Sequence, residues 1–290
     1  MKPQECCVVE GAGPHLSRNA LCLRASVVFS CCLVATPCVA QEPEPLEDNS
    51  FLLEEAYNQE PGVVQEISAF TRASGGSDWT YTLTQEWPLG GVRHQLSYTI
   101  PLEHHSDFNT TGLGDVLLNY RFQALGAEGG NVYLAPRLSG VFPTGRVRSG
   151  RGNGTLGAQV NVPLTVMVAP RLATHWNAGV TLLPSAENAL GHQATTASLN
   201  AGASVIWLVR PLFNLMLEVV WLRETEVAGA GVTARQGAGF LNPGFRWGFN
   251  CCRGLQIVTG LAYTIGLTNA DPDALFLYLS FEHPFRRLTQ

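Results

Sequence analysis

The chain has 290 residues, of which 46% are hydrophobic and only 14% are charged, and its formal net charge is −5. Soluble domains carry about 25% charged residues, and nucleic-acid binding requires a basic face, so neither class fits this composition well. No apolar run reaches the roughly 18 residues that a membrane-spanning helix needs. The chain is therefore either a compact protein with few surface charges or a protein whose outer face meets lipid.

Residues 1–40 have the organisation of a cleavable signal peptide. A positively charged beginning is followed by the apolar core Ala25–Ala35 and then by small residues before Gln41. Cys31 and Cys38 follow small residues, so a lipoprotein anchor is the alternative. Six of the eight cysteines lie in this segment, which leaves one adjacent pair, Cys251 and Cys252. That pair can form neither a disulfide framework nor a four-ligand zinc site, so we expect no metal and no cofactor.

Residues 41–62 are acidic and rich in proline, and we interpret them as a periplasmic N-terminal leader with a short ordered part at 51–57. From Val63 onward the pattern changes to segments of about ten residues with alternating apolar and polar positions, separated by Gly, Pro, Asn and Asp. Their lengths match the 9–11 residues of a transmembrane β-strand. Twelve such segments can be counted, at 63–72, 79–88, 92–104, 113–124, 131–142, 155–164, 171–182, 195–208, 212–225, 237–249, 255–265 and 275–285.

The two faces of these segments differ in chemistry. In 113–124, Leu118 and Tyr120 lie on an apolar face, while Asn119 and Arg121 lie on the other. A soluble β-sandwich also alternates in this way. However, the polar positions favour Gly, Asn, Gln, Ser and Thr over Lys and Glu, and Trp and Tyr recur near segment ends, as in the aromatic girdles of outer-membrane barrels. The sequence thus predicts an all-β, antiparallel up-and-down transmembrane β-barrel at 63–285.

The links between segments alternate between long and short, with long links at Pro143–Gly154, Pro184–Ala194 and Glu226–Gln236. Outer-membrane barrels place long loops outside and short turns in the periplasm. This predicts that both termini are periplasmic and that Cys251 and Cys252 lie in a periplasmic turn. The last segment ends in aromatic residues, the pattern that the barrel-assembly machinery reads, and a C-terminal tail at 286–290 follows it.

Three stretches carry a family resemblance: AYNQEPGVVQEISAFTR before and within the first segment, GLGDVLLNYRFQ in the fourth, and SGVFPTG at the end of the fifth. They resemble the bacterial outer-membrane, transporter-like barrels of the phenol meta-pathway (MetA-type) family. The Gly112, Gly114 and Asp115 strand start is the most specific of these motifs. The resemblance implies uptake or export of small, often hydrophobic compounds, but a fold does not establish a function.

Charged residues at inward positions of a membrane barrel are candidates for lining a pore, because a lone charge that faces lipid costs several kcal/mol. They can form networks that only fill and stiffen the interior, or they can select solutes. The segment 51–60 can also enter the lumen from the periplasmic side and plug it. The candidate pore-lining residues are Glu66, Glu86, Glu103, Asp115, Arg121, Arg137, His175, Glu218, Arg246 and Glu282.

The outer link 145–154 (GRVRSGRGNG) is basic and is predicted to contact anionic lipopolysaccharide or anionic solutes, or to be only a solvated loop. Its glycines resemble a phosphate loop, but no strand–loop–helix context surrounds them. His104 and Ser106 share one strand face and raise the alternative of a membrane-embedded lipid or ester hydrolase. No third catalytic member is evident, and nucleophilic catalysis needs one.

Taken together, these patterns favour a non-enzymatic channel or transporter in the bacterial outer membrane, for small solutes that include hydrophobic and aromatic ones. The expected partners are outer-membrane lipid and lipopolysaccharide, the barrel-assembly machinery during biogenesis, and a small-molecule solute, with no nucleic acid. A closed structural or adhesive barrel remains the main alternative to the channel.

Overall fold

The computed structural model describes residues 46–47, 49–251, 254–268 and 271–285. The predicted signal peptide at 1–40, the first part of the leader, Cys252 and the tail at 286–290 lie outside these residues. No helix in the described ranges is long and apolar enough to cross a membrane.

Fourteen strands form one antiparallel sheet that closes on itself. In chain order they are β1 Val63–Ala73, β2 Trp79–Pro88, β3 His94–His105, β4 Thr110–Leu113, β5 Val116–Phe122, β6 Val132–Leu134, β7 Arg137–Phe142, β8 Gly157–Ala169, β9 Leu172–Glu187, β10 Gln193–Arg210, β11 Phe213–Gly229, β12 Val232–Asn250, β13 Gln256–Gly266 and β14 Ala274–Pro284.

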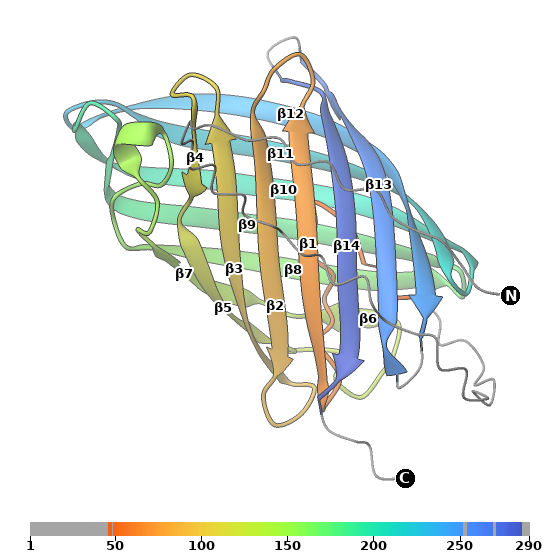
Figure 1. Ribbon diagram of the computed structural model, residues 1–290. Coiled ribbons are helices and arrows are strands. Elements are labelled where there is room, and N and C mark those ends of the chain that lie inside the picture. The colour runs from red at the N-terminus through yellow and green to blue at the C-terminus, as the bar shows by residue number, and fades with distance from the viewer. Residues whose placement is uncertain (1–45, 48, 252–253, 269–270, 286–290) are drawn as a thin grey trace, which may run out of the picture. The chain divides into compact units, whose positions relative to one another are not determined.

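The ring closes where β1 pairs with β14 on one side and with β2 on the other. Because β4 and β5 both pair with β3, and β6 and β7 both pair with β8, each of these pairs is one interrupted strand of the barrel. The predicted closed barrel of 12 strands is therefore confirmed. In Figure 1, β2, β1 and β14 lie side by side at the front, and β8 to β11 cross behind them. Full closure leaves no exposed sheet edge.

Each of the two interruptions spans two residues. Gly114 and Asp115 separate β4 from β5, and Ala135 and Pro136 separate β6 from β7. Proline has no N–H to donate to a ladder, so Pro136 contributes no donor at the second break, although Pro101, Pro163 and Pro243 lie within paired strands elsewhere. The predicted segments 113–124 and 131–142 each contain one of these breaks.

The sequence prediction is wrong for one of the long links. The stretch predicted as the long link Glu226–Gln236 is strand, because β11 and β12 pair as far as Gly229 and Val232, around a two-residue turn. Gly231 in that turn has φ of +69°, which glycine adopts without a steric penalty. Side chains at both faces are exposed in this stretch, so the alternation of apolar and polar residues disappears although the strand pairing continues.

We call the end of the barrel that carries this hairpin the loop end, and the opposite end, where β1 begins and β14 finishes, the turn end. The turn end carries the links β2–β3, β5–β6, β8–β9, β10–β11 and β12–β13. Cys251 lies at the turn end between β12 and β13, as an exposed free thiol. The longest link, between Phe142 and Gly157, lies at the loop end and contains the 3-10 turn η1 at Val147–Ser149.

The outward and inward faces have the chemistry that the alternation predicts. On β5, Leu118 and Tyr120 are 46% and 40% exposed, whereas Asn119 and Arg121 are 3% and 4% exposed. The same contrast holds on β12 between outward Trp247 and inward Arg246. The outer surface is thus an apolar band, and most polar side chains are buried inside the ring, where a soluble sandwich would hold its apolar core.

Candidate functional site: the plugged lumen

All but one of the predicted pore residues face the inside of the barrel. The strand registers and burial place on the inner face Glu86, Glu103, Asp115, Arg121, Arg137, His175, Glu218, Arg246 and Glu282. An inward position does not by itself make these residues the lining of a solute path, because several of them contact the chain's own N-terminal segment.

The exception is Glu66, whose predicted place in the lumen is wrong. It lies directly opposite Phe281 on β14 and Gln85 on β2, and both belong to the outward face. Gln65, its neighbour, takes the inward position and is 2% exposed. Two consecutive polar residues give no alternation at this point, so the sequence pattern alone cannot decide which of them faces the lumen.

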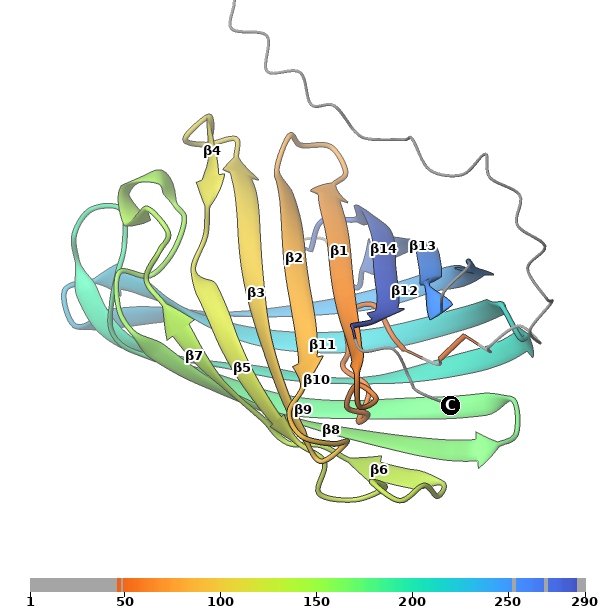
Figure 2. The ribbon, with the colours of Figure 1, turned by 60° about the horizontal axis from the view of Figure 1, so that its bottom comes forward.

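Of the described chain, residues 46–47 and 49–60 run through the lumen before β1 begins, and we call them the plug. Figure 2 shows this segment, in red and orange, within the ring of strands. The sequence left open whether residues 51–60 enter the lumen, and in the structure they do. The plug forms no strand of its own, so its backbone needs hydrogen-bond partners from the wall.

Glu218 on β11 supplies the central contact of the plug. Its Oε1 accepts hydrogen bonds from the backbone N–H groups of Phe51, Leu52 and Leu53, at 3.1, 2.9 and 3.2 Å. Its other oxygen accepts from the amide of Asn242 at 2.6 Å. The carboxylate is 0% exposed. A buried carboxylate requires several donors to replace its lost hydration, and three consecutive backbone groups meet that requirement here.

Uncharged side chains of the wall accept hydrogen bonds from four further backbone N–H groups of the plug. The acceptors are Asn177 for Glu54 N–H at 3.1 Å, Thr165 for Ala56 at 2.9 Å, Gln123 for Asn58 at 3.0 Å and Gln95 for Gln59 at 2.6 Å. Sequence reasoning did not single out these four residues as functional. Their inward parity and amide or hydroxyl chemistry were the available signals, but the target was a backbone that only the tertiary structure brings near.

Two arginines bind the acidic part of the plug. Arg137 forms an ion pair with Glu54 at 2.8 Å, and Arg121 forms longer pairs with Glu55 at 3.6 Å and with Glu86 of β2 at 3.5 Å. Arg121 also donates to the backbone oxygen of Glu55 at 3.1 Å. Burial raises the pKa of Glu55 to about 7, against the opposing effect of the Arg121 charge, and the nearby carboxylate of Glu86 adds to the rise.

The beginning of the plug is held near the turn end. Arg246 donates to the backbone oxygens of Glu47 and Asn49, both at 3.1 Å, and lies 5.2 Å from the centre of the Tyr278 ring. Phe51 packs between Phe276 and Tyr278, with ring centres 5.0 and 5.3 Å away. The plug is thus anchored by charge, by backbone hydrogen bonds and by an aromatic contact.

Beside the plug toward the loop end lies a cavity of about 430 Å³, which we call the apolar chamber. Its polar lining comes from Asp78, His104, His105 and three threonines, Thr71, Thr80 and Thr264. A more polar cavity of about 340 Å³ shares Leu52, Val220 and Leu222 with it and is also lined by Glu54, Arg137 and Glu224. The apolar part of the chamber is lined by Leu52, Ala73, Val220, Leu222, Phe240 and Ala274.

The loop-end link is pinned inward by Asp115, the acidic residue of the Gly112, Gly114 and Asp115 motif. Its carboxylate accepts hydrogen bonds from the backbone N–H groups of Gly145 and Asn153, at 3.0 and 2.8 Å. Arg151 of the predicted basic loop is 6% exposed, whereas Arg146 and Arg148 are exposed. The basic loop therefore presents two of its three arginines to solvent.

Comparison with solved structures identifies the fold. The COG4313 outer membrane channel from Pseudomonas putida F1 aligns with a TM-score of 0.57 and 12% identity, covering 81% of this chain and 99% of that one. The KdgM porin in complex with disordered oligogalacturonate (TM-score 0.44, 6% identity, 77% and 99% covered) is a weaker likeness. So is the transport unit of the autotransporter AIDA-I from Escherichia coli (0.41, 13%, 82% and 95%). These two likenesses are too weak to support an argument.

No curated protein matches the chain by sequence. A family model does match it over residues 48–265, a range that begins inside the plug and ends in β13. The matched range is more than half of the chain and includes most of the plug, most residues of the apolar chamber and most of the wall. The chain therefore belongs to the family described as "Putative MetA-pathway of phenol degradation".

Proposed function

We propose that this protein is an outer-membrane channel for small apolar solutes and that its own N-terminal segment regulates passage. The apolar chamber is the observation that carries this proposal. The other apolar side chains of the described inner wall, such as Ile206, Met216 and Phe276, are buried in clusters with one another or with Phe51 of the plug. Those of the chamber line an open volume instead, and a water-filled pore would not need a patch of Leu, Val, Phe and Ala on such a wall.

The size of the chamber fits a small organic molecule. Ligand pockets span about 300–1,000 Å³ and combine an apolar lining with a few polar groups, and this chamber has about 430 Å³ and a mixed lining of apolar and polar side chains. An aromatic ring would exchange water for contact with Val220, Leu222 and Phe240. Burial of apolar surface contributes roughly 25 cal/mol per Å², which is enough for weak, reversible binding.

The comparisons agree with this proposal. The solved structure from Pseudomonas putida F1 is a channel by name, and the family description refers to phenol degradation, in which aromatic compounds are handled. We therefore include small aromatic compounds among the candidate solutes.

A closed structural barrel is the second candidate, and the plug supports it. Seven backbone N–H groups between residues 51 and 59 are hydrogen-bonded to wall side chains. A segment held by this many hydrogen bonds occupies a fixed position in the lumen. Passage through the barrel thus requires that part of the plug is displaced, and a barrel whose plug never moves would be structural.

Solute flux into liposomes separates the two candidates. We expect the wild-type protein to admit a small phenol faster than a sugar of equal mass. The variant Val220→Thr with Leu222→Asn should reduce phenol entry about tenfold, because it replaces apolar chamber walls with polar groups. Val219→Thr makes the same Val-to-Thr substitution at the adjacent position, whose side chain faces outward, and should leave the flux unchanged.

A plug variant provides the second arm of this experiment. Glu218→Ala leaves three backbone donors without their acceptor, and each buried orphan costs about 1–3 kcal/mol, so phenol and ion flux should both rise. Equal and negligible flux for wild type, the chamber variant and Glu218→Ala would instead establish the closed structural barrel.

We propose no hydrolytic role for His104 and Ser106. Nδ1 of His104 is hydrogen-bonded to the Thr111 hydroxyl at 2.9 Å, and its ring stacks on Trp79. Ser106 contacts Asp78 instead, through its backbone N–H at 2.5 Å and its hydroxyl. These donors lower the pKa of Asp78. Ester hydrolysis that disappears in Ser106→Ala would refute this part of the proposal.

The placement in the envelope is part of the same proposal. The turn end faces the periplasm, residues 1–40 are removed as a signal peptide, and the exposed Arg146 and Arg148 at the loop end contact lipopolysaccharide. The outward apolar residues of β14, with Phe285 after it, present the aromatic-ended final strand that the barrel-assembly machinery would bind.

A further inference from the structure

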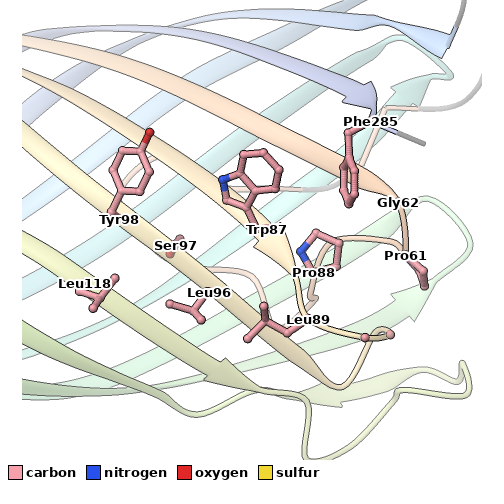
Figure 3. A pocket seen from close by; sticks show the side chains of 12 residues that line it. Pro61, Gly62, Trp87, Pro88, Leu89, Leu96, Ser97, Tyr98, Leu118 and Phe285 are labelled. Atoms are coloured by element: carbon pink, nitrogen blue, oxygen red, sulfur yellow. The ribbon is translucent and has the colours of Figure 1, made fainter. Parts of the chain in front are cut away.

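A large cavity lies on the outside of the barrel, at the turn end. It has a volume of about 840 Å³, and we call it the outer groove. Figure 3 shows its side chains: Trp87 and Phe285 stand next to each other, and Leu96, Tyr98 and Leu118 lie along the neighbouring strands. The centres of the Trp87 and Phe285 rings are 5.5 Å apart.

A polar row runs along the border of this groove, and no part of the channel proposal uses it. Glu66, Gln85 and Tyr98 lie directly opposite one another on β1, β2 and β3. The Tyr98 hydroxyl donates to Gln85 Oε1 at 2.7 Å, and the Gln85 amide donates to Glu66 Oε1 at 2.8 Å. Tyr98 itself lines the groove, so the row connects the groove to a carboxylate.

This carboxylate needs a positive charge that the surrounding wall does not supply. The row continues to Phe281 on one side and to Leu118 on the other. Gln85 satisfies one oxygen of Glu66, and no hydrogen bond or ion pair of the described residues reaches the other. An ionised acid on the lipid-facing surface of a barrel is destabilising unless it lies near the interface or is paired.

The level of the row within the barrel favours an interfacial partner. Glu66 is the fourth residue of β1, close to the turn end, and Trp87, Tyr98 and Phe285 form an aromatic belt around it. Such belts lie at the height of the lipid head groups. A head group that carries an ammonium can therefore reach Glu66 while its acyl chain lies on the apolar side chains.

We propose that the outer groove binds a phospholipid with a primary ammonium head group, as in ethanolamine lipids. The ammonium pairs with Glu66, the phosphoester oxygens lie near Gln85 and Tyr98, and one acyl chain packs along Trp87, Leu96 and Leu118. The groove volume lies within the range of about 300–1,000 Å³ that ligand pockets occupy. This site is independent of solute passage, because it lies on the other side of the wall from the lumen.

A second copy of the chain fits this surface less well. A two-fold symmetric interface centred here would place the same patch on both sides, so two Glu66 carboxylates would approach each other. That pairing adds a like charge where an opposite charge is needed. The charge of the row thus selects a cationic head group over a second barrel.

Native mass spectrometry of the delipidated, folded protein tests the proposal, with phosphatidylethanolamine, phosphatidylcholine and phosphatidylglycerol of identical chains as probes. We expect the ethanolamine lipid to bind most tightly. Glu66→Gln should weaken its binding about tenfold, the loss expected for a hydrogen bond to a charged group, and should leave the glycerol lipid unaffected. Glu128→Gln, an exposed acid outside the groove at the same end, is the matched control.

Leu118→Trp fills the groove beside Tyr98, keeps the side chains of Glu66, Gln85 and Tyr98 unchanged, and keeps the test decisive if Glu66→Gln folds poorly. It should reduce binding of all three lipids, while heat-dependent gel mobility shows that the barrel remains folded. Equal affinity for the three lipids in wild type, or unchanged ethanolamine binding in both groove variants, would overturn the proposal. So would a dimer that dissociates in Leu118→Trp. Phenol flux is expected to stay at the wild-type level in Glu66→Gln, which separates this test from that of the channel.

Discussion

Single side chains decide how the lumen is filled. Glu218 is fully buried and would be unfavourable as an isolated charge, but three backbone N–H groups of the plug and one amide surround it. Arg121 and Arg137 bind the acidic residues of the plug in the same way. The inward charges of this barrel are thus partners of the plug before they are partners of any solute.

The raised pKa of Glu55 makes plug docking depend on pH. Burial raises this pKa from the ordinary value of 4.5 to about 7, with Glu86 and Glu54 adding to the rise and Arg121 opposing it. The docked plug therefore holds a proton that the released segment gives up, and docking weakens as pH increases from about 4.5 to about 7.

Hydrogen exchange of residues 46–60, corrected for the intrinsic exchange rate, measures this effect. We expect stronger protection at pH 5 than at pH 8, by a few kcal/mol at most. Glu55→Gln, which cannot ionise, should show protection that no longer depends on pH in this window. An identical pH dependence in wild type and Glu55→Gln would assign the effect to another group.

At the scale of elements, the plug and the wall fit each other by shape as well as by hydrogen bonds. Gly244 on β12 and Gly260 on β13 make room for the Phe51 ring. A methyl group at Gly244 would come within 2.8 Å of that ring, and a methyl group at Gly260 would overlap it. These two glycines leave room for the plug, because any side chain at either position would occupy the volume of the Phe51 ring.

Gly260→Ala should therefore displace Phe51 and loosen the plug. Overpacking of this kind costs about 1–3 kcal/mol, and we expect faster hydrogen exchange in residues 49–54 with an unchanged exchange rate in β8 and β9. Gly237→Ala is the control, because its nearest neighbour would be 3.9 Å away. Adding Phe51→Leu to Gly260→Ala should restore part of the protection, and additive losses in the double variant would contradict the contact.

At the scale of the whole molecule, closure of the sheet sets where the two ends of the barrel lie and which side chains meet on its surface. β1 and β14 pair along their full lengths, which places both ends of the described barrel at the turn end. Closure also brings Phe285 against Trp87 and forms one side of the outer groove. Neither the aromatic belt nor the groove exists until the first and last strands have met.

Cysteine labelling tests the orientation of the barrel. In a background with Cys251→Ser and Cys252→Ser, Leu190→Cys introduces a thiol at the loop end and Glu128→Cys one at the turn end. Both native side chains are highly exposed, at 80% and 91%. An impermeant maleimide should label Leu190→Cys in intact cells and Glu128→Cys only after the outer membrane is permeabilised. The opposite pattern would place the turn end outside.

The sequence by itself determined the barrel, because strand alternation and lipid contact are local properties that recur in every strand. It also predicted that Arg121, Arg137, Glu218 and Arg246 face inward, and it allowed 51–60 to enter the lumen without deciding that it does. Where local alternation fails, the sequence could not decide which residue faces the lumen, as at the consecutive Gln65 and Glu66, or where a strand ends, as at the exposed β11–β12 hairpin.

Only the tertiary structure decided what the inward groups bind. Glu218 and Phe51 are 167 residues apart in sequence, and no periodicity relates a wall carboxylate to the backbone of a distant leader. The apolar chamber combines side chains from β1, β11, β12 and β14, and the outer groove combines β2, β3, β5 and Phe285. Such sites depend on which strands closure makes neighbours, and that information lies in the pairing of the whole sheet.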